Sequence, residues 1–151
     1  MLNKISTSYR KAPCYNTLFS SIENILMFED ANLFNFIYNS LKLINNYLNS
    51  PTNLIVSSSI PIDHSLKSEG KVLAICKALS ATQYINPIGD LAFYNKDVFK
   101  NEGIDLYFLN TNNIFYTQFH NEFVPFLSIL DVFMFNEKEK AKILLKQFIL
   151  Q

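Results

Sequence analysis

The stretch from residue 82 to residue 109 places the tightest limit on the fold. Residues 82–86 form a short run of strand-forming side chains that ends in an Asn-Pro-Ile-Gly turn, and residues 104–109 form a second run directly after Gly103. The residues between the two runs have helical spacing, and Gly103 stands where a helix commonly ends in a left-handed residue. Strand, turn, helix, glycine and strand in this order are typical of a parallel α/β unit.

The rest of the chain extends this unit on both sides. The short continuous run of β-forming residues at 54–56 predicts a further strand, over 54–60, that is covered on both faces. Two helical patterns precede it, at about 16–28 and 30–48, and predict an N-terminal αα-hairpin in which Asp30 caps the second helix. Ser68 is expected to cap a helix that reaches Leu79. We therefore predict an α/β fold with helices flanking a small parallel sheet of about three strands, at 54–60, 82–86 and 104–109.

Two C-terminal helices complete the predicted fold. The first is a mostly apolar helix at 125–135, and the second opens at Asn136, which has capping-box spacing to Glu139. In the second helix we expect Ile143, Leu144 and Phe148 to face inward.

Composition and charge narrow the function classes. Of the 151 residues, 49% are hydrophobic and 17% are charged, which is typical of a single globular domain spanning 1–151. Thirteen Lys and Arg balance thirteen Asp and Glu, so we expect neither nucleic acid nor an anionic membrane as a partner. The uncharged segment 43–62 is interrupted by Asn, Ser and Pro, which excludes a membrane span. The N-terminus has no apolar signal-peptide core, so we expect a cytoplasmic protein.

The common cofactor and metal motifs are absent from the sequence. Its three glycines form neither a dinucleotide-binding fingerprint nor a phosphate-binding loop, and the sequence names no cofactor. Cys14 and Cys76 are far apart and unpatterned, so we interpret them as reduced thiols and predict no metal site. The segment 67–71, Lys-Ser-Glu-Gly-Lys, either presents amides and lysines to an anion or forms a solvated helix cap.

Asp131 is the acid that most needs an explanation. It lies within the otherwise apolar run 126–135, and a carboxyl group in such a run needs a partner or has a shifted pKa. Two interpretations stay open: a structural hydrogen-bond network, or a functional site. His64 and His120 are available as bases, but a loop histidine without a catalytic role fits each position as well.

Several segments, taken in order, resemble a known family. They are Ser-Tyr-Arg-Lys-Ala-Pro at 8–13, Tyr-Ile-Asn-Pro-Ile-Gly at 84–89, Phe-Lys-Asn-Glu-Gly-Ile-Asp-Leu at 99–106, Tyr-Thr-Gln-Phe at 116–119 and Ser-Ile-Leu-Asp at 128–131. In this order and spacing the chain resembles the C-terminal part of the WbqC-like family, over roughly residues 5–149. Family members usually carry a further N-terminal portion with a Gln-Pro-Tyr-like opening and an Asp-Asp segment. Because nothing here matches that portion, we expect a shortened member, a fragment of a split gene, or a late-start reading of one.

The resemblance implies a role in bacterial surface polysaccharide (O-antigen) biosynthesis. It implies acyl or aminoacyl transfer to a nucleotide-linked amino sugar, with a nucleotide sugar or an acyl carrier as substrate. Asp131 and His120 are then the candidate catalytic residues, as base or orienter. The candidate substrate-binding residues are Ser58, Lys71, Tyr84, Asn86, Gly89, Tyr116, Gln118 and Ser128.

An alternative function stays open. The chain is then a non-catalytic binding or assembly subunit, or a truncated member that needs a partner chain. This alternative predicts an exposed apolar sheet edge or patch, and association with a second copy or with an N-terminal partner chain.

Overall fold

The computed structural model describes residues 1–120 and 122–151, and within them the chain forms two compact units. The helical unit comprises residues 1–53 and 113–147, and the sheet unit comprises residues 54–112 and 148–151. The predicted α/β class is confirmed, with a sheet of three strands and flanking helices. The single domain spanning 1–151 stays a prediction.

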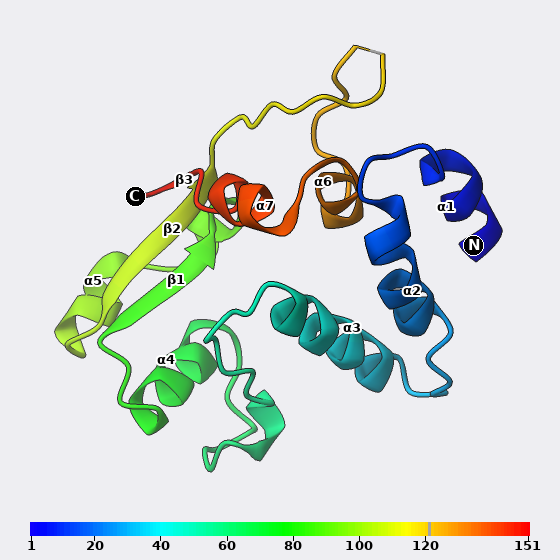
Figure 1. The fold of residues 1–151 in the computed structure, drawn as a ribbon. Helices are drawn as coiled ribbons and strands as arrows, with labels where there is room; N and C mark the ends of the chain where they lie inside the picture. Colours follow the sequence, from blue (N-terminus) through cyan, green and yellow to red (C-terminus); the bar gives the residue numbers. More distant parts are fainter. Residues whose placement is uncertain (121) are drawn as a thin grey trace. The chain divides into compact units, whose positions relative to one another are not determined.

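The helical unit contains the predicted αα-hairpin. Its helices are α1 (Leu2–Tyr9), α2 (Tyr15–Leu26), α3 (Leu33–Tyr47), α6 (Ile129–Phe135) and α7 (Lys138–Leu144). Helices α2 and α3 pack against each other as the hairpin (Figure 1). Asn32, rather than Asp30, caps α3, since its side chain accepts the Phe34 N–H at 2.9 Å. Asp30 instead accepts the N–H of Asn32 itself, at 2.7 Å, and so holds the cap in place.

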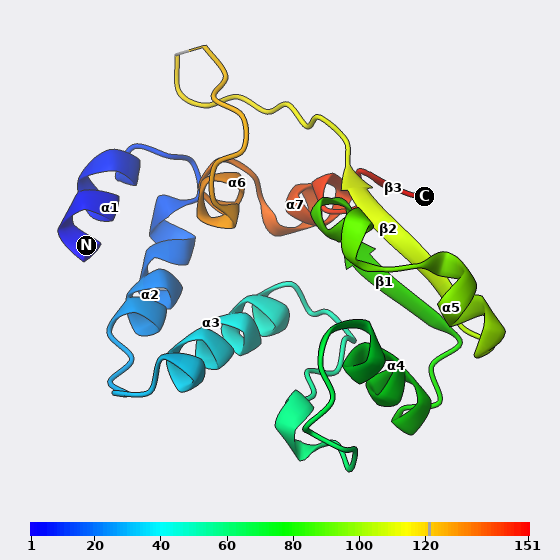
Figure 2. The ribbon, with the colours of Figure 1, turned by 180° about the vertical axis from the view of Figure 1, so that it is seen from behind.

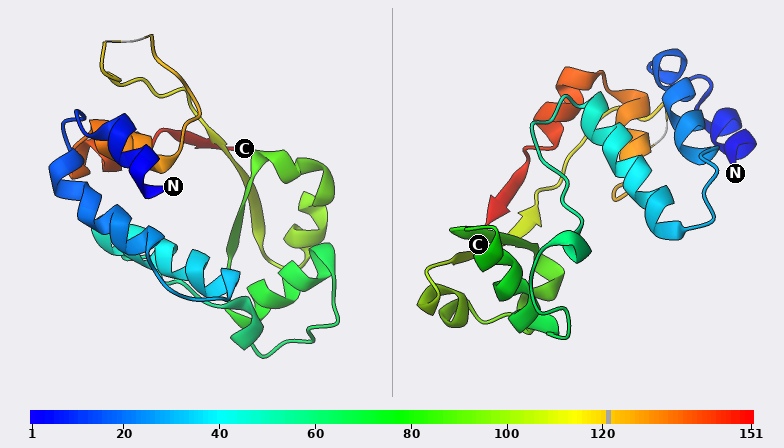
Figure 3. Two further views of the ribbon diagram at one scale, coloured as in Figure 1. Left: turned by 90° about the vertical axis from the view of Figure 1, so that its right-hand side faces the viewer. Right: turned by 90° about the horizontal axis from the view of Figure 1, so that it is seen from below.

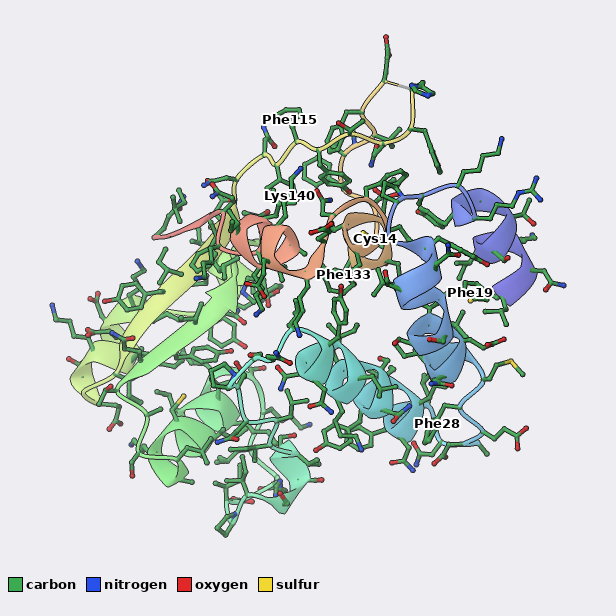
Figure 4. The ribbon with its side chains drawn as sticks, in the orientation of Figure 1. Cys14, Phe19, Phe28, Phe115, Phe133 and Lys140 are labelled. Carbon is green, nitrogen blue, oxygen red and sulfur yellow. The ribbon has the colours of Figure 1, made fainter. Side chains whose placement is uncertain are left out.

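The core of the helical unit joins α2 to α6. Leu18 and Ile22 of α2 are buried with the Val-Phe-Met sequence at 132–134 of α6. The Cys14 N–H donates to the Met134 carbonyl at 3.0 Å, which links the start of α2 directly to α6. Phe133 points from α6 toward α3 (Figure 4), where its ring centroid lies 5.1 Å from that of Tyr47. The part of the apolar run that follows Asp131, residues 132–134, therefore forms the centre of this core.

The sheet unit is built on a parallel strand pair. Its elements are η1 (Ser57–Ser59), α4 (Ser68–Ala78), β1 (Gln83–Pro87), η2 (Ile88–Phe93), α5 (Lys96–Asn101), β2 (Asp105–Thr111) and β3 (Phe148–Leu150). Strand β1 pairs with β2 in parallel, with Gln83 opposite Asp105 and Pro87 opposite Leu109. Helix α5 forms the crossover and packs against β2 (Figure 2). The strands predicted at 82–86 and 104–109 are confirmed, and so is the left-handed Gly103, with a φ of 73°.

The strand predicted at 54–60 is wrong. Val56 has extended dihedral angles, but residues 57–59 form the short 3-10 helix η1. Ser59 explains the difference, because its N–H and its hydroxyl both donate to the Val56 carbonyl, at 2.9 and 2.7 Å. Serine hydroxyls compete in this way with strand pairing for backbone partners. The β-propensity of residues 54–56 predicts a strand, but it does not take into account the serine hydroxyl that competes for the Val56 carbonyl.

The third strand lies instead at the C-terminus, so the sheet is not entirely parallel. β3 pairs antiparallel with β2, with Leu109 opposite Leu150 and Thr111 opposite Phe148 (Figure 3). Two further hydrogen bonds of 3.0 Å join Phe108 and Gln151, each of which donates to the other. Phe148 was expected on the inner face of a helix, but α7 ends at Leu144. The paired backbone groups of β2 account for the extended conformation of the last residues.

Two predicted caps and one predicted helix start also differ from the structure. Helix α4 begins at Ser68, with Lys67 as its N-cap and no side-chain capping bond. Helix α7 is preceded by Glu137 as N-cap, because the Asn136 side chain donates to the Val132 carbonyl at 2.8 Å. Helix α6 begins at Ile129 rather than near residue 125. In the described residues, no helix combines the length and the apolarity that crossing a membrane requires.

Candidate functional site

The Asp131 carboxylate of α6 is the centre of a buried hydrogen-bond network. Its side chain is only 3% exposed. The Tyr9 hydroxyl donates to Oδ1 at 2.9 Å, and the Tyr116 hydroxyl and the Gln118 amide donate to Oδ2 at 2.6 and 2.7 Å. We call these four side chains the Asp131 network. Three donors satisfy most of the acceptor capacity of a carboxylate, so the network meets the requirement that a buried charge be hydrogen-bonded.

Local structure positions Asp131 in the first turn of α6. Ser128 caps this helix: its hydroxyl accepts the Leu130 N–H at 3.3 Å, and its carbonyl accepts the Asp131 N–H at 2.8 Å. A carboxylate in the first turn is also favoured by the partial positive charge of the helix N-terminus. Ser128 therefore holds the backbone of Asp131 in place, and the network holds its side chain.

Gln118 fixes the loop that leads to α6. Its amide oxygen accepts the Val124 N–H at 2.7 Å, and its amide nitrogen donates to the Val124 carbonyl at 3.1 Å as well as to Asp131. One buried side chain thus pairs with both backbone groups of Val124 and with the carboxylate. The loop and the carboxylate are consequently positioned together.

All the donors to Asp131 are neutral groups. The salt bridges that the structure describes lie elsewhere, between Lys77 and Glu102 and between Lys142 and Glu139. Burial, and next the hydrogen bond to Asp131 and its charge, raise the pKa of Tyr9 to about 12. The same causes, in the same order, raise the pKa of Tyr116 further above its usual value. Both hydroxyls therefore stay protonated at neutral pH and keep donating to the carboxylate.

A pocket of about 200 Å³ opens beside this network. It is lined by Ser8, Tyr9, Gln118, Phe119, Glu122, Val124, Leu127, Asp131 and Phe135. Two nearby aromatic residues have positive φ angles, 45° at Phe119 and 57° at Phe126. Such angles are unfavourable for bulky side chains, and strained backbone of this kind concentrates at functional sites. Within the helical unit the buried carboxylate, the pocket and the strained backbone occur together.

Three of the candidate residues meet in this network, namely Asp131, Tyr116 and Gln118. Ser128 belongs to the same region through the backbone of α6. His120 is exposed, and no hydrogen bond described in the structure joins it to Asp131. Its catalytic role stays a prediction, as do the roles of the other candidates.

The remaining candidates lie in the sheet unit. The Tyr84 hydroxyl donates to the Asn86 side chain at 3.1 Å, and Asn86 donates to Asp90 at 3.1 Å, so β1 and η2 share a short polar chain. Burial, and next the hydrogen bond to Tyr94, raise the pKa of Tyr84 to about 12. Lys71 donates to the His64 carbonyl at 3.2 Å, while Ser58 and Gly89 are exposed.

Among the polar and charged residues that line the pocket, sequence reasoning missed three: Ser8, Tyr9 and Glu122. Tyr9 lies in the Ser-Tyr-Arg-Lys-Ala-Pro segment that carries the family resemblance, but no local pattern connects it with Asp131. Glu122 lies in a loop, and nothing in the surrounding sequence distinguishes it from a solvent-exposed glutamate. Across residues 1–120 and 122–151, no group of three or more His, Cys, Asp or Glu side chains is placed to hold a metal ion.

Comparison with known proteins places the chain in a family. A search of curated proteins gave no match, and neither did a search of solved structures. The family model described as "WbqC-like protein family" matches residues 1–143, a range that contains the whole Asp131 network. The chain therefore belongs to the WbqC-like protein family.

Proposed function

We propose that this protein is a cytoplasmic enzyme of bacterial surface polysaccharide (O-antigen) assembly that transfers an acyl or aminoacyl group to a nucleotide-linked amino sugar. Family membership supports the setting. The single observation that carries the site is the buried Asp131 carboxylate, which lines a pocket and is held by two tyrosines and a glutamine.

The Tyr9–Asp131 pair is suited to removing a proton from an amine. A sugar amine that binds as the ammonium ion first releases one proton to water, because only the neutral nitrogen has a lone pair. As this nitrogen attacks the carbonyl carbon of an acyl thioester, a C–N bond forms and the C–S bond breaks. The amine proton passes to the Tyr9 oxygen while the Tyr9 proton moves to Oδ1 of Asp131. The departing thiolate then takes that proton from Asp131, which restores the site and yields an amide and a thiol. In this sequence Asp131 acts as the orienter of Tyr9 and as the final proton acceptor within the site.

An acylation assay tests this function. The full chain is incubated with a nucleotide-linked sugar that carries a free amine and with an acyl thioester, and the amide product is followed by mass spectrometry. Tyr9→Phe removes one hydroxyl and keeps the ring, so we expect at least a 100-fold loss of rate, within the range for general acid–base catalysis. Glu23→Gln, an exposed change on α2, is the control and should keep the rate. A Tyr9→Phe protein that is folded and fully active would contradict the relay.

A second function is favoured by one observation on α3. Leu33, Phe34, Ile37 and Leu41 are all exposed, with 70% exposure at Leu33, and they recur at helical spacing on one stripe. Apolar side chains gathered in this way mark interaction surfaces. This favours an assembly subunit that pairs through α3 with another copy or with a partner chain.

Sedimentation separates this second function from the first. The native chain is expected to associate as its concentration rises, and Ile37→Lys is expected to abolish the association. Asn46→Lys adds the same charge at an exposed position of α3 and serves as the control. A chain that stays monomeric at every concentration, alone and with the polypeptide encoded upstream, contradicts the assembly function.

A further inference from the structure

The direction of the hydrogen bonds determines what the Asp131 pocket can recognise. A tyrosine hydroxyl has one proton, and Tyr9 and Tyr116 both direct theirs at the carboxylate. The two amide protons of Gln118 go to Asp131 and to the Val124 carbonyl. No side chain of the Asp131 network therefore keeps a proton to donate, and the oxygens of Tyr9 and Asp131 that line the pocket offer only lone pairs. The hydroxyl of Ser8, which also lines the pocket, can donate as well as accept and carries no charge.

The charges of the pocket point the same way. Two carboxylates, Asp131 and Glu122, line it, and no Lys, Arg or His is among its described lining residues. A phosphate or a carboxylate in this place would lose its hydration, gain no cation and lie close to a buried negative charge. A cationic group, in contrast, is attracted by the two carboxylates and finds oxygen atoms that accept its hydrogen bonds.

The volume of the pocket and its apolar lining limit the size and the polarity of the ligand. Phe119, Val124, Leu127 and Phe135 supply apolar walls around the acidic end. The volume of about 200 Å³ lies below the range of roughly 300 to 1,000 Å³ that is usual for pockets that enclose a drug-sized ligand. The pocket therefore has room for one six-membered ring but not for a nucleotide.

We propose that the Asp131 pocket binds a primary amine in its ammonium form, carried on a single ring with an apolar face, and that it rejects anionic groups. The inference deepens the proposed function, on which it rests for identifying the ring as the sugar of an amino-sugar substrate. The nucleotide portion of such a substrate stays outside this pocket.

Three ring compounds of matched size test the selectivity with the full chain. Cyclohexylamine, cyclohexanol and cyclohexanecarboxylate are titrated into the protein, and binding is followed by NMR shifts of the tyrosine ring protons. A hydrogen bond to a charged group is worth more than one between neutral groups, so we expect cyclohexylamine to bind about ten-fold more tightly than cyclohexanol. Cyclohexanecarboxylate should not bind. Equal binding of amine and alcohol, or tighter binding of the carboxylate, overturns the inference.

A matched pair of variants locates the effect. Glu122→Gln removes a rim charge without touching the buried network, and it should weaken cyclohexylamine binding several-fold while leaving cyclohexanol unchanged. Glu23→Gln is the control and should alter neither. Unchanged amine binding in Glu122→Gln would contradict the role of the second carboxylate.

The two proposals fail in different experiments. If the amine is selected but no nucleotide-linked amino sugar is acylated, the acyl-transfer function is wrong and the amine site stands. If the amide product forms but the ring series shows no amine preference, the enzyme stands and this account of its pocket is wrong.

Discussion

Tyr9 and Asp131 are joined by a hydrogen bond of 2.9 Å across 122 residues of sequence. The bond connects the last residue of α1 with the first turn of α6. Because Tyr9 keeps its proton well above neutral pH, its hydroxyl stays a donor to Asp131 throughout the physiological range. It also brings together in the candidate site one residue from α1 and one from α6.

Replacing the carboxylate should destabilise the helical unit. In Asp131→Asn an NH2 group replaces one accepting oxygen, and the negative charge that strengthens all three hydrogen bonds is lost. We expect the free energy of unfolding to fall by about 2 kcal/mol or more, as measured by urea unfolding. The exposed Glu23→Gln change should stay within about 0.5 kcal/mol of the native chain. Equal midpoints for both variants would show that the network adds no stability.

The raised tyrosine pKa values predict how stability depends on alkaline pH. Tyr9 and Tyr84 have a pKa of about 12 in the folded chain, and that of Tyr116 is higher, against about 10 in an unfolded chain. Between pH 10 and 12 the unfolded state has released protons that the folded state keeps. Unfolding is therefore favoured, and stability is complete below pH 10 and falls as the pH rises through this window.

Phenolate absorbance measures this effect directly. In Tyr9→Phe the titration should lose one group near pH 12. In Asp131→Asn the pKa of Tyr9 should fall but stay above 10, since burial is the larger cause of its shift. A native titration that is complete by pH 11 would contradict the buried network.

Replacement by alanine should destabilise the chain at Phe133 but not at Phe126. Phe133 is buried against Tyr47, so Phe133→Ala should cost about 3 to 5 kcal/mol through lost burial and the cavity it leaves. Phe126 is 88% exposed, and Phe126→Ala should change the unfolding free energy by less than about 0.5 kcal/mol. Thermal melts of the two variants check the difference. Similar losses for both would mean that Phe126 is buried in solution.

Two glycines offer a matched pair in the sheet unit. A Cβ atom at either Gly70 or Gly103 would meet nothing within 4 Å, so sterics with neighbours do not distinguish them. Only Gly103 has a positive φ, 73°, where a side chain is strained. Gly103→Ala should therefore destabilise by roughly 1 kcal/mol, whereas Gly70→Ala, inside α4, should stabilise by roughly 0.5 to 1 kcal/mol. Chemical unfolding measures the change in the free energy of unfolding for each variant. A change of the same sign in both would contradict the left-handed conformation of Gly103.

The sequence by itself determined the elements whose causes are local. The parallel pair at 82–86 and 104–109, the crossover helix between them and the left-handed Gly103 follow from apolar spacing and from the conformational freedom of glycine. The αα-hairpin follows from helical periodicity. The importance of Asp131 was also visible, because a carboxyl group in an apolar run needs partners wherever it folds.

Only the tertiary structure decided which partners these are. Tyr9 meets Asp131 because α1 and α6 are brought together by packing, which no short-range pattern encodes. The third strand lies at Phe148–Leu150 rather than at 54–60 because the open edge of β2 supplies backbone partners there, while Ser59 claims the Val56 carbonyl. Periodicity reports which face a segment buries. Hydrogen-bond partners distant in sequence decide whether that segment becomes a strand, and which side chains form the site.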